Sequence, residues 1–310
     1  MDLSIIIVTR NRARDLASTL ASLRGIHVPD TMRAELLVVD NGSTDETRAV
    51  VSQSDLGPIE TRYAHEPCPG LSHGRNTGLR ESRGGMILFT DDDIRPPTNW
   101  IEEMTRPILN GQAEAVCGGV EIAPHLLRPW MTTLHRCLLA STEWLEKPQN
   151  LSMVGANMSF VRHVLDRVPA FDTELGSGAL GSCEELLFSK QLIAAGYRIR
   201  KCLHSRVMHH FDPARLKRGS WVWAVLQLGA SHAYIGHHWE DWPCRLTGFR
   251  LLVSGLTFQS RSQPGRENED GCPENELKRH LNHSLLKAHA RESSRPRNYQ
   301  RNGLRKIGSP

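Results

Sequence analysis

The chain has 310 residues, of which 39% are apolar and 23% charged, so it can bury a sizeable core in one large domain. This composition excludes a chain that is disordered throughout. The formal net charge of +4 is uneven, because Gln259–Pro310 holds eleven Lys/Arg against six Asp/Glu. The first 258 residues are therefore close to neutral, and the basic excess belongs to the tail.

The seven cysteines are scattered without a Cys-x-x-Cys pair, which argues against a disulfide framework and against a zinc site. An apolar stretch begins directly after Met1-Asp2, without the basic segment and cleavage site of a signal peptide. The longest apolar stretch, 221–235, is shorter than the roughly 18 residues that suggest a membrane span. We expect a cytoplasmic protein, with peripheral contact at the inner face of a membrane as an alternative.

Three apolar runs bounded by polar turns, Leu3–Val8, Leu36–Val39 and Met86–Phe89, predict strands buried on both faces. Between the first two, leucines at helical spacing over 16–23 predict a helix. After the second, Ser43–Glu46 has the spacing of a capping box that opens another helix. Alternating strands and helices favour an α/β fold with a parallel sheet and right-handed crossovers, whose ligands bind beyond the carboxyl ends of the strands.

Further elements follow along the chain. We expect a helix over 99–110, a strand over 115–120, and a second capping box formed by Ser182 and Glu185. Gly196 is a good stop for the helix that this capping box opens.

The ordered domain is expected to span residues 1–258. In the tail, 259–310, small, polar and charged residues dominate, and we expect it to be irregular and basic. Within it, only 274–290 has leucines at helical spacing, which permits a short amphipathic helix.

The most informative cluster is Asp91-Asp92-Asp93, which directly follows an apolar run. Adjacent carboxylates at the end of a buried strand repel one another unless a cation offsets their charge. Hard divalent ions such as Mg²⁺ and Mn²⁺ take oxygen ligands, and Asp91 and Asp93, two residues apart, could reach one ion together. The alternative is a solvated acidic turn, but the position at a strand end favours a metal site.

A second carboxylate, Asp40, also stands at the end of a predicted strand, in Val39-Asp-Asn-Gly-Ser43. Asp40 could accept hydrogen bonds from the N–H groups of a nucleobase, and the helix beyond Ser43 offers backbone donors. Asp-Asn-Gly is equally an ordinary turn, and on its own this string favours the turn.

Together, these strings resemble glycosyltransferase family 2, inverting enzymes of the GT-A fold that use nucleotide-diphosphate sugars. The resemblance covers residues 3–210 and rests on the order and spacing of strings that are weak singly. They are Ser4-Ile-Ile-Ile-Val-Thr-Arg-Asn-Arg12, Val39-Asp-Asn-Gly-Ser-Thr-Asp45, Pro69-Gly-Leu-Ser-His-Gly-Arg-Asn-Thr-Gly78, Phe89-Thr-Asp-Asp-Asp93, Gly155-Ala-Asn-Met-Ser159, Ala170-Phe-Asp172, Cys183-Glu-Glu-Leu186 and Val207-Met-His209.

For the donor, the resemblance implies that Thr9 and Asp40 hold the nucleobase and that Arg75 lies near the nucleotide. Asp91-Asp92-Asp93 contains the family's DxD motif, in which Asp91 and Asp93 bind Mn²⁺ or Mg²⁺ and the cluster, Asp92 included, contacts the donor pyrophosphate. It also implies a donor half over 1–120.

For the acceptor, the resemblance implies that Asn157 faces the sugar or the acceptor, within an acceptor half over 121–258. His209 matches a histidine near the metal and diphosphate. Glu185 stands where the family has its catalytic Asp. A carboxylate there would remove the proton of the attacking hydroxyl, and a helix N-terminus would keep it ionised. Glu185 could equally serve only as the cap partner of Ser182.

The implied partners are a nucleotide sugar, with uridine favoured, and a glycan or lipid-linked acceptor of polysaccharide or glycoconjugate synthesis. A sugar nucleotidyltransferase is the nearest rival, but Thr9–Arg12 lacks the glycine-rich, lysine-containing loop that such an enzyme needs. The missing G-x-G-x-x-G pattern likewise disfavours a dinucleotide oxidoreductase. A non-enzymatic protein that binds surfaces or nucleic acid through the tail is a further alternative, although the tail has Tyr299 as its single aromatic residue, and we expect no nucleic-acid partner.

Overall fold

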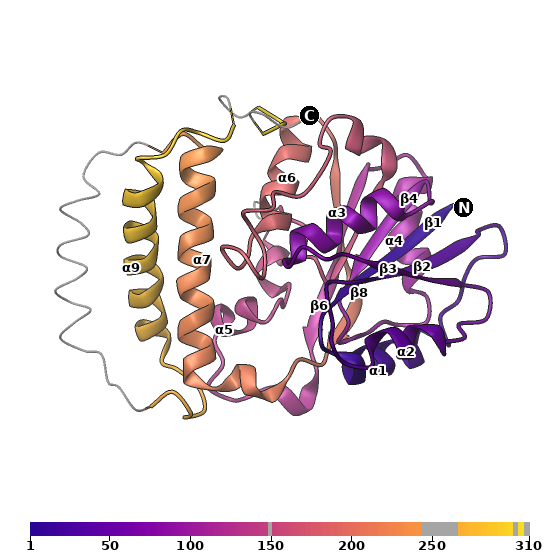
Figure 1. The fold of residues 1–310 in the computed structure, drawn as a ribbon, viewed down its shortest axis with the longest axis horizontal. Coiled ribbons are helices and arrows are strands. Elements are labelled where there is room, and N and C mark those ends of the chain that lie inside the picture. The colour runs from indigo at the N-terminus through magenta and orange to yellow at the C-terminus, as the bar shows by residue number, and fades with distance from the viewer. Residues whose placement is uncertain (148–150, 243–265, 300–302, 307–310) are drawn as a thin grey trace. The chain divides into compact units, whose positions relative to one another are not determined.

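The computed structural model describes residues 1–147, 151–242, 266–299 and 303–306. In this part of the chain, eight strands form one mixed sheet in the order β3-β2-β1-β4-β7-β6-β8-β5 (Figure 1). The strands are β1 (Leu3–Thr9), β2 (Ala34–Asp40), β3 (Glu60–His65), β4 (Met86–Thr90), β5 (Ile94–Arg95), β6 (Ala115–Ile122), β7 (Asn157–Val161) and β8 (Ile199–His209).

The direction of each strand follows from its pairing. β1 pairs in parallel with β2 and β4, and β2 pairs in parallel with β3. β7 is antiparallel to both β4 and β6, so β6 and its parallel partner β8 run the same way as β1. β5 runs against β8 at the edge. The prediction of an α/β fold with a mostly parallel sheet is therefore confirmed.

The four predicted strands are present as β1, β2, β4 and β6, and every residue of β2 and β4 is buried. Their continuous apolar runs reflect burial on both faces, as parallel strands require. β3 was not predicted, because its sequence Glu-Thr-Arg-Tyr-Ala-His at the sheet edge is polar and at most half-buried.

The described helices connect these strands. They are α1 (Ala13–Leu23), α2 (Thr47–Ser52), α3 (Leu71–Glu81), α4 (Trp100–Leu109), α5 (Thr133–Leu138), α6 (Glu184–Ala194), α7 (Arg218–His238) and α9 (Glu274–Glu292), with short 3₁₀ turns at Pro124–Leu126, Glu143–Glu146, Arg162–Asp166 and Pro213–Leu216. None of them is long and apolar enough to cross a membrane.

The predicted capping box at Ser43 is wrong. Helix α2 begins later, at Thr47, whose backbone N–H donates to the Asp45 carboxylate at 3.1 Å. The Ser43 hydroxyl instead accepts a hydrogen bond from the backbone N–H of Asn11 at 2.9 Å. The Ser43 side chain thus connects the loops that follow β1 and β2 and does not cap α2.

Helix α3 lies close against β1 because two glycines, one helical turn apart, face the strand. A Cβ atom on Gly74 would lie 2.3 Å from Val8 Cγ1, and one on Gly78 would lie 2.6 Å from Ile6 Cγ2. Real Cβ atoms do not approach that closely, so these positions need glycine. The close packing fixes α3, and with it Arg75, relative to the end of β1.

The chain divides into two compact units. Unit 1 comprises 1–127, 140–173 and 184–210, and it contains the whole sheet. Unit 2 comprises 128–139, 174–183 and 211–310. The predicted boundary after Phe258 lies outside the described residues. The two expected halves of the domain contribute strands to the same sheet.

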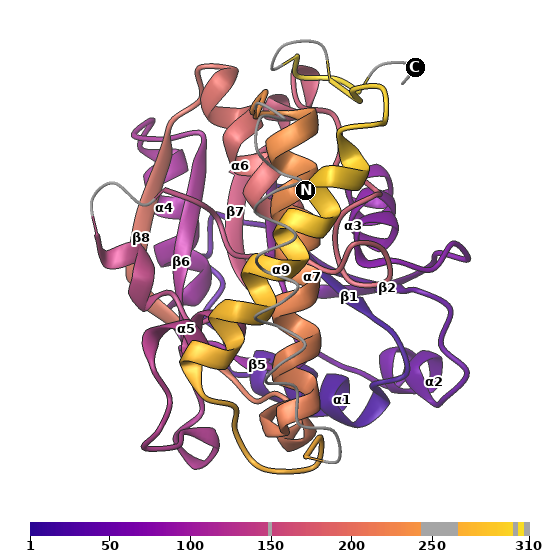
Figure 2. The ribbon, with the colours of Figure 1, turned by 90° about the vertical axis from the view of Figure 1, so that its left-hand side faces the viewer.

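In unit 2, α7 and α9 run side by side (Figures 1 and 2). They approach closely at Gly229, where a Cβ atom would lie 2.8 Å from the backbone of Leu281. His238 Nε2 lies 3.1 Å from Glu292 Oε2, and both side chains are fully buried. The leucine spacing thus predicted this helix correctly, but residues 274–292 of the supposedly irregular tail are folded, because α9 has a partner helix that a local pattern does not show.

Candidate active site

Every residue proposed for the site from the sequence lies in unit 1. β1, β2, β4, β6 and β8 run in one direction, so their carboxyl ends share one edge of the sheet. Thr9 pairs with Asp40 across the ends of β1 and β2. Asp91–Asp93 follow β4, and β8 ends at His209. The edge that the parallel-sheet argument selected therefore carries the candidate residues.

The turn after β4 brings Asp93 to His209. After this turn the chain forms β5, which pairs with β8 so that Ile94 lies opposite His209, and His210 N–H donates to the Asp93 carbonyl at 2.7 Å. Asp93 Oδ1 lies 3.3 Å from His209 Nε2, and both side chains are buried. This oxygen has no hydrogen-bond partner among the described residues. A buried carboxylate oxygen in that state is costly unless something else binds it.

Arg12 supplies positive charge to the aspartate cluster. Its guanidinium Nη1 lies 2.9 Å from Asp92 Oδ1, and its Nη2 lies 2.7 Å from Asp93 Oδ2. Burial alone would raise the pKa of Asp93, but His209 and Arg12 outweigh it and hold that pKa well below its usual value. The sequence reasoning missed Arg12. The available signal was its position three residues after a strand that lies beside β4 in a parallel sheet.

The pKa values of the other two aspartates, Asp91 and Asp92, are raised. Burial raises the pKa of Asp92 to about 7 in spite of its ion pair with Arg12. Burial, reinforced by the charge of Asp93, also raises the pKa of Asp91, while Arg75 opposes the rise. The cluster thus contains more negative charge than the neighbouring cations compensate.

Thr9 and Asp92 were expected to contact the donor, Thr9 at the nucleobase and Asp92 at the pyrophosphate, but in the structure they contact each other. The Thr9 hydroxyl donates to Asp92 Oδ2 at 2.6 Å, and both residues are buried. Asp92 also holds Arg12. These side chains are turned towards each other, so they are suited to fixing the acidic turn on β1 and less suited to direct contact with a nucleobase or a pyrophosphate.

Asp40 is placed as expected of a residue that accepts hydrogen bonds. Its Oδ1 accepts from the Ser43 backbone N–H at 2.7 Å, and its Oδ2 accepts from the Tyr63 hydroxyl at 2.8 Å. Burial and this bond to Asp40 raise the pKa of Tyr63 to about 12. A carboxylate has about four lone-pair sites, so Asp40 retains capacity for a base N–H. Tyr63 is a further residue that the sequence analysis missed, because it lies on the unpredicted strand β3.

The Arg75 side chain is buried, and it is held by contacts within the protein. Its Nη1 forms an ion pair with Glu184 Oε1, and its guanidinium lies over the rings of Phe89 and Phe171 at 5.9 and 5.5 Å. A Cβ atom on Gly155 would lie only 1.9 Å from Arg75 Nη2. The expected contact with the nucleotide is therefore not supported, and Arg75 instead fixes the first residue of α6.

Glu185 is the second residue of α6, next to this ion pair. Its Oε2 is buried without a hydrogen-bond partner among the described residues. Burial and the adjacent charge of Glu184 raise the pKa of Glu185 to about 8, and Arg75 opposes the rise. The expectation that the helix dipole keeps this carboxylate ionised is wrong, because burial and a like charge outweigh the dipole.

The alternative role of Glu185, as the partner of Ser182 in a capping box, is also not seen in the structure. Helix α6 begins at Glu184, and the Ser182 hydroxyl lies 3.5 Å from Ser231 Oγ. Just before the helix, Cys183 has φ +70°, in the left-handed region that non-glycine residues rarely adopt. A strained residue at this position sets the direction in which α6 starts, and such strain is often found at functional sites.

Asn157 lies at the correct edge, opposite Thr90, but its amide is already bonded. Its Nδ2 donates to the carbonyls of Gly119 at 2.8 Å and Ser205 at 2.9 Å, and its Oδ1 accepts from Trp100 Nε1 at 2.9 Å. Both amide donors are used, and the side chain is fully buried. Asn157 therefore joins β6, β8 and α4, and contact with a sugar is not supported.

A second group of potential metal ligands, Glu103, Cys202 and His204, lies between α4 and β8. Pro107 cannot donate the helical hydrogen bond to the Glu103 carbonyl, and the Cys202 thiol donates to that carbonyl at 3.5 Å. His204 Nε2 lies 2.6 Å from the Glu103 carboxylate. These contacts give the three residues a structural role, because the Cys202 thiol replaces the backbone hydrogen bond to Glu103 that Pro107 cannot make.

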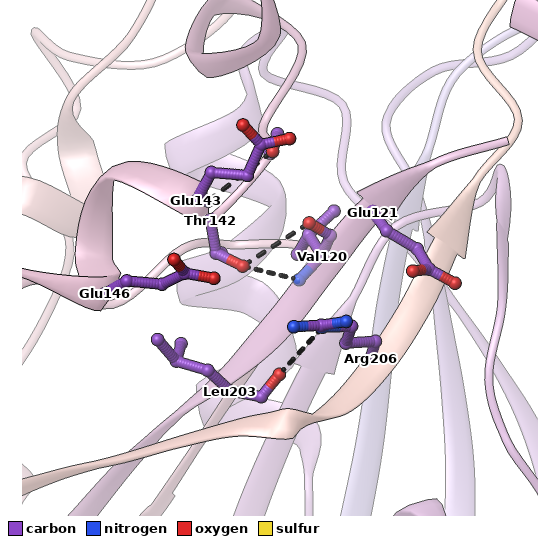
Figure 3. Close-up of a pocket in the computed structure, with 8 residues that line it drawn as sticks. Val120, Glu121, Thr142, Glu143, Glu146, Leu203 and Arg206 are labelled. Carbon is purple, nitrogen blue, oxygen red and sulfur yellow. Dashed lines mark hydrogen bonds between the residues drawn. The ribbon is translucent and has the colours of Figure 1, made fainter. Parts of the chain in front are cut away.

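A pocket of about 270 Å³ opens beside β6 and β8 (Figure 3). Figure 3 shows the Glu146 carboxylate and the Arg206 guanidinium facing each other across it. Glu121, Glu143 and the hydroxyl side chains of Ser141 and Thr142 also line it, with Val120 and Leu203. The pocket is therefore rich in groups that hydrogen-bond to hydroxyls.

The residues at the sheet edge fit a hard divalent ion. Asp91 and Asp93 offer carboxylate oxygens, one of them buried without a partner, and His209 offers an imidazole nitrogen beside it. Such donors suit Mg²⁺ or Mn²⁺.

These features define an α/β protein with an acidic ligand site at the carboxyl edge of its sheet. The profile of the family described as "Glycosyl transferase family 2" matches residues 4–168, just over half of the chain. The chain therefore belongs to this family.

Two curated relatives match parts of the chain. The succinoglycan biosynthesis protein ExoM of Rhizobium meliloti is 32% identical over 111 residues, which cover 35% of this chain and 36% of ExoM. The glycosyltransferase AglE of Haloferax volcanii is 32% identical over 120 residues, covering 38% and 39%. The matches thus span little more than a third of these relatives.

Solved structures share the fold. The mannosyltransferase PcManGT of Pyrobaculum calidifontis, in complex with GDP-Man and Mn²⁺, has a TM-score of 0.54 at 17% identity, covering 94% of this chain and 73% of that chain. S. aureus TarS 1–349 with UDP has a TM-score of 0.53 at 17% identity, covering 98% and 95%. The expected GT-A fold is therefore confirmed.

Proposed function

We propose that the chain transfers a sugar from a nucleoside-diphosphate sugar, with UDP favoured, to an acceptor hydroxyl, in a reaction that depends on Mn²⁺ or Mg²⁺ and inverts the anomeric carbon. One observation carries the proposal: Asp91, Asp93 and His209 meet at the carboxyl edge of the sheet, where a buried Asp93 oxygen has no hydrogen bond. PcManGT, a structure of the same fold, is described with GDP-Man and Mn²⁺, and a TarS structure with UDP-GlcNAc.

In this proposal Asp91, Asp93 and His209 would hold the ion, which when bound would supply positive charge to stabilise the leaving diphosphate. Asp40 accepts hydrogen bonds from the nucleobase with the lone pairs that Ser43 and Tyr63 leave free.

Glu185 removes the proton of the acceptor hydroxyl. The hydroxyl oxygen then bonds to the anomeric carbon as the bond from that carbon to the phosphate oxygen breaks, and a single displacement of this kind inverts the centre. A base is most effective when its pKa lies near the working pH, and the pKa of Glu185, about 8, meets that condition.

The acceptor side of the reaction is assigned to the pocket of Figure 3. Strands β6 and β8, which contribute residues to its lining, end at Ile122 and His209, at the sheet edge that carries the proposed metal site. Carboxylates and a guanidinium in one pocket suit the hydroxyls of a glycan. The likeness to ExoM supports a role in polysaccharide synthesis, and cytoplasmic placement, with peripheral contact at a membrane face, stays part of the proposal.

The direct test is binding of UDP with and without Mn²⁺ by calorimetry, followed by release of nucleotide from UDP-, GDP- and dTDP-sugars. Asp93→Asn should weaken Mn²⁺-dependent UDP binding at least about tenfold, since it removes a ligand to the ion. Asp30→Asn, at an exposed turn, makes the same change outside the site and should have no effect. Undiminished UDP binding by Asp93→Asn, or in EDTA, would contradict the metal assignment.

A further inference from the structure

The guanidinium of Arg12 lies beside the buried carboxylates of Asp92 and Asp93 and offsets part of their negative charge. Its Nε, Nη1 and Nη2 reach Asp15, Asp92 and Asp93 at 3.2, 2.9 and 2.7 Å. The side chain is 34% exposed, whereas the Asp92 and Asp93 side chains are 4% and 2% exposed. The guanidinium thus covers two buried carboxylates while remaining open to solvent on its other side.

Arg12 forms ion pairs with Asp92 and Asp93, and these two carboxylates differ in their other contacts. Asp92 is also bound by the Thr9 hydroxyl at 2.6 Å, so two side chains hold it in place. Asp93 has one oxygen paired with Arg12 and a second oxygen without a hydrogen bond. A divalent ion at Asp93 would repel the guanidinium a few ångströms away, and this repulsion ends if the guanidinium leaves Asp93 or if an anion arrives.

The guanidinium can exchange partners without losing its anchor. It has five N–H groups, and its three partners use three of them. Arginine is well suited to phosphate oxygens because its planar fork can bind two of them at once. Arg12 can therefore keep Asp92 while it turns from Asp93 to a phosphate.

We propose that Arg12 is an exchangeable internal cation: it neutralises Asp93 in the free enzyme, yields Asp93 to the divalent ion, and then binds the diphosphate of the donor. This inference rests on the proposed function. Its consequence is that metal and nucleotide bind cooperatively. The ion alone competes with Arg12 and binds weakly, whereas ion and diphosphate together give every charge a partner.

The test compares two affinities on the full chain: Mn²⁺ alone, followed by electron paramagnetic resonance of the free ion, and UDP in saturating Mn²⁺, followed by calorimetry. Arg12→Gln removes the competing charge, so Mn²⁺ alone should bind about tenfold more tightly. The same variant loses a diphosphate ligand, so UDP should bind about tenfold more weakly, within the usual range of coupling between sites. Opposite changes in one variant are not expected from general damage to the site.

Two further variants support the comparison. Arg14→Gln removes the same charge from an exposed position on α1 and should leave both affinities unchanged. Arg12→Lys keeps the charge but not the fork, so Mn²⁺ alone should bind as weakly as in the unmodified chain. Melting temperatures identify any variant whose site has unfolded.

The outcomes separate the two proposals. If the unmodified chain binds UDP equally with and without Mn²⁺, the proposed metal-dependent function fails. If it binds both ligands cooperatively but Arg12→Gln leaves the affinity for Mn²⁺ alone unchanged or weaker, the exchange role of Arg12 is refuted and the proposed function stands.

Discussion

Replacing Glu185 by glutamine should make the protein inactive and, above about pH 6, more stable. Glutamine has nearly the same shape, but its amide is never ionised and is too weakly basic to accept the proton of a hydroxyl, so it cannot act as the base. Loss of a positioned general base lowers turnover by about 10² to 10⁴. The gain in stability follows because the folded state keeps Glu185 protonated at pH values well above 4.5, the pKa of an unperturbed glutamate.

The magnitude follows from the pKa. The pKa of Glu185 rises from 4.5 to about 8 on folding, and each unit corresponds to 1.36 kcal/mol. For a carboxyl whose pKa is raised, stability is fully present below pH 4.5 and is lost as the pH rises towards 8. The free energy of unfolding of Glu185→Gln should therefore match that of the unmodified chain near pH 4.5 and exceed it by roughly 3–5 kcal/mol at pH 8.

Urea unfolding at pH 5, 6.5 and 8, with turnover measured on the same samples, checks both effects. Glu81→Gln, an exposed carboxylate at the end of α3, should show neither. Turnover of the unmodified chain should rise with pH towards 8 as Glu185 ionises. If the stability difference does not grow between pH 5 and 8, Glu185 is ionised in the folded protein and the burial argument fails. If Glu185→Gln transfers sugar at a normal rate, the base lies elsewhere.

Three further predictions concern packing and the acceptor. Gly155→Ala should lower stability by about 1–3 kcal/mol and reduce turnover, because its Cβ would displace Arg75, which thermal unfolding and a donor assay would show. A chain ending at Trp242 should lose helical circular dichroism and melt at lower temperature, because it leaves the buried His238 without Glu292; unchanged melting would show α9 to be dispensable. Arg206→Gln should raise the acceptor KM about tenfold and leave the donor KM unchanged; an equal rise in both would place the pocket on the donor side.

The sheet could be predicted where burial alone determines a strand. β1, β2 and β4 have continuous apolar runs because both of their faces are covered. β3 could not, because an edge strand needs no apolar alternation. The cap at Ser43 failed for another reason: its hydroxyl had an equally good partner 32 residues away, in Asn11, and sequence spacing does not distinguish a local partner from a distant one.

The site divides in the same way. Asp40, Asp91 and Asp93 were predictable because each ends or follows a predicted strand and such ends meet at one edge, whereas His209 ends the unpredicted strand β8 and was indicated only by the family resemblance. The partners that decide the roles of other residues were not predictable. Arg75 meets Glu184 across 109 residues of sequence, a contact made possible by the absence of a side chain at Gly155.

The balance of buried charge links these residues into one network. Asp91 interacts electrostatically with Arg75, His209 and Arg12, and Arg75 in turn interacts with both Glu184 and Glu185. Arg95 also interacts with Asp93, so these five carboxylates face the guanidinium groups of Arg12, Arg75 and Arg95 and the imidazole of His209. Without another cation, the protein reduces its negative charge by raising the pKa of Asp91, Asp92 and Glu185 towards protonation. A divalent ion would supply the missing charge at Asp91 and Asp93, and its field would favour the ionised form of Glu185 that the proposed reaction requires. Metal binding and activation of the base would then be parts of a single electrostatic change.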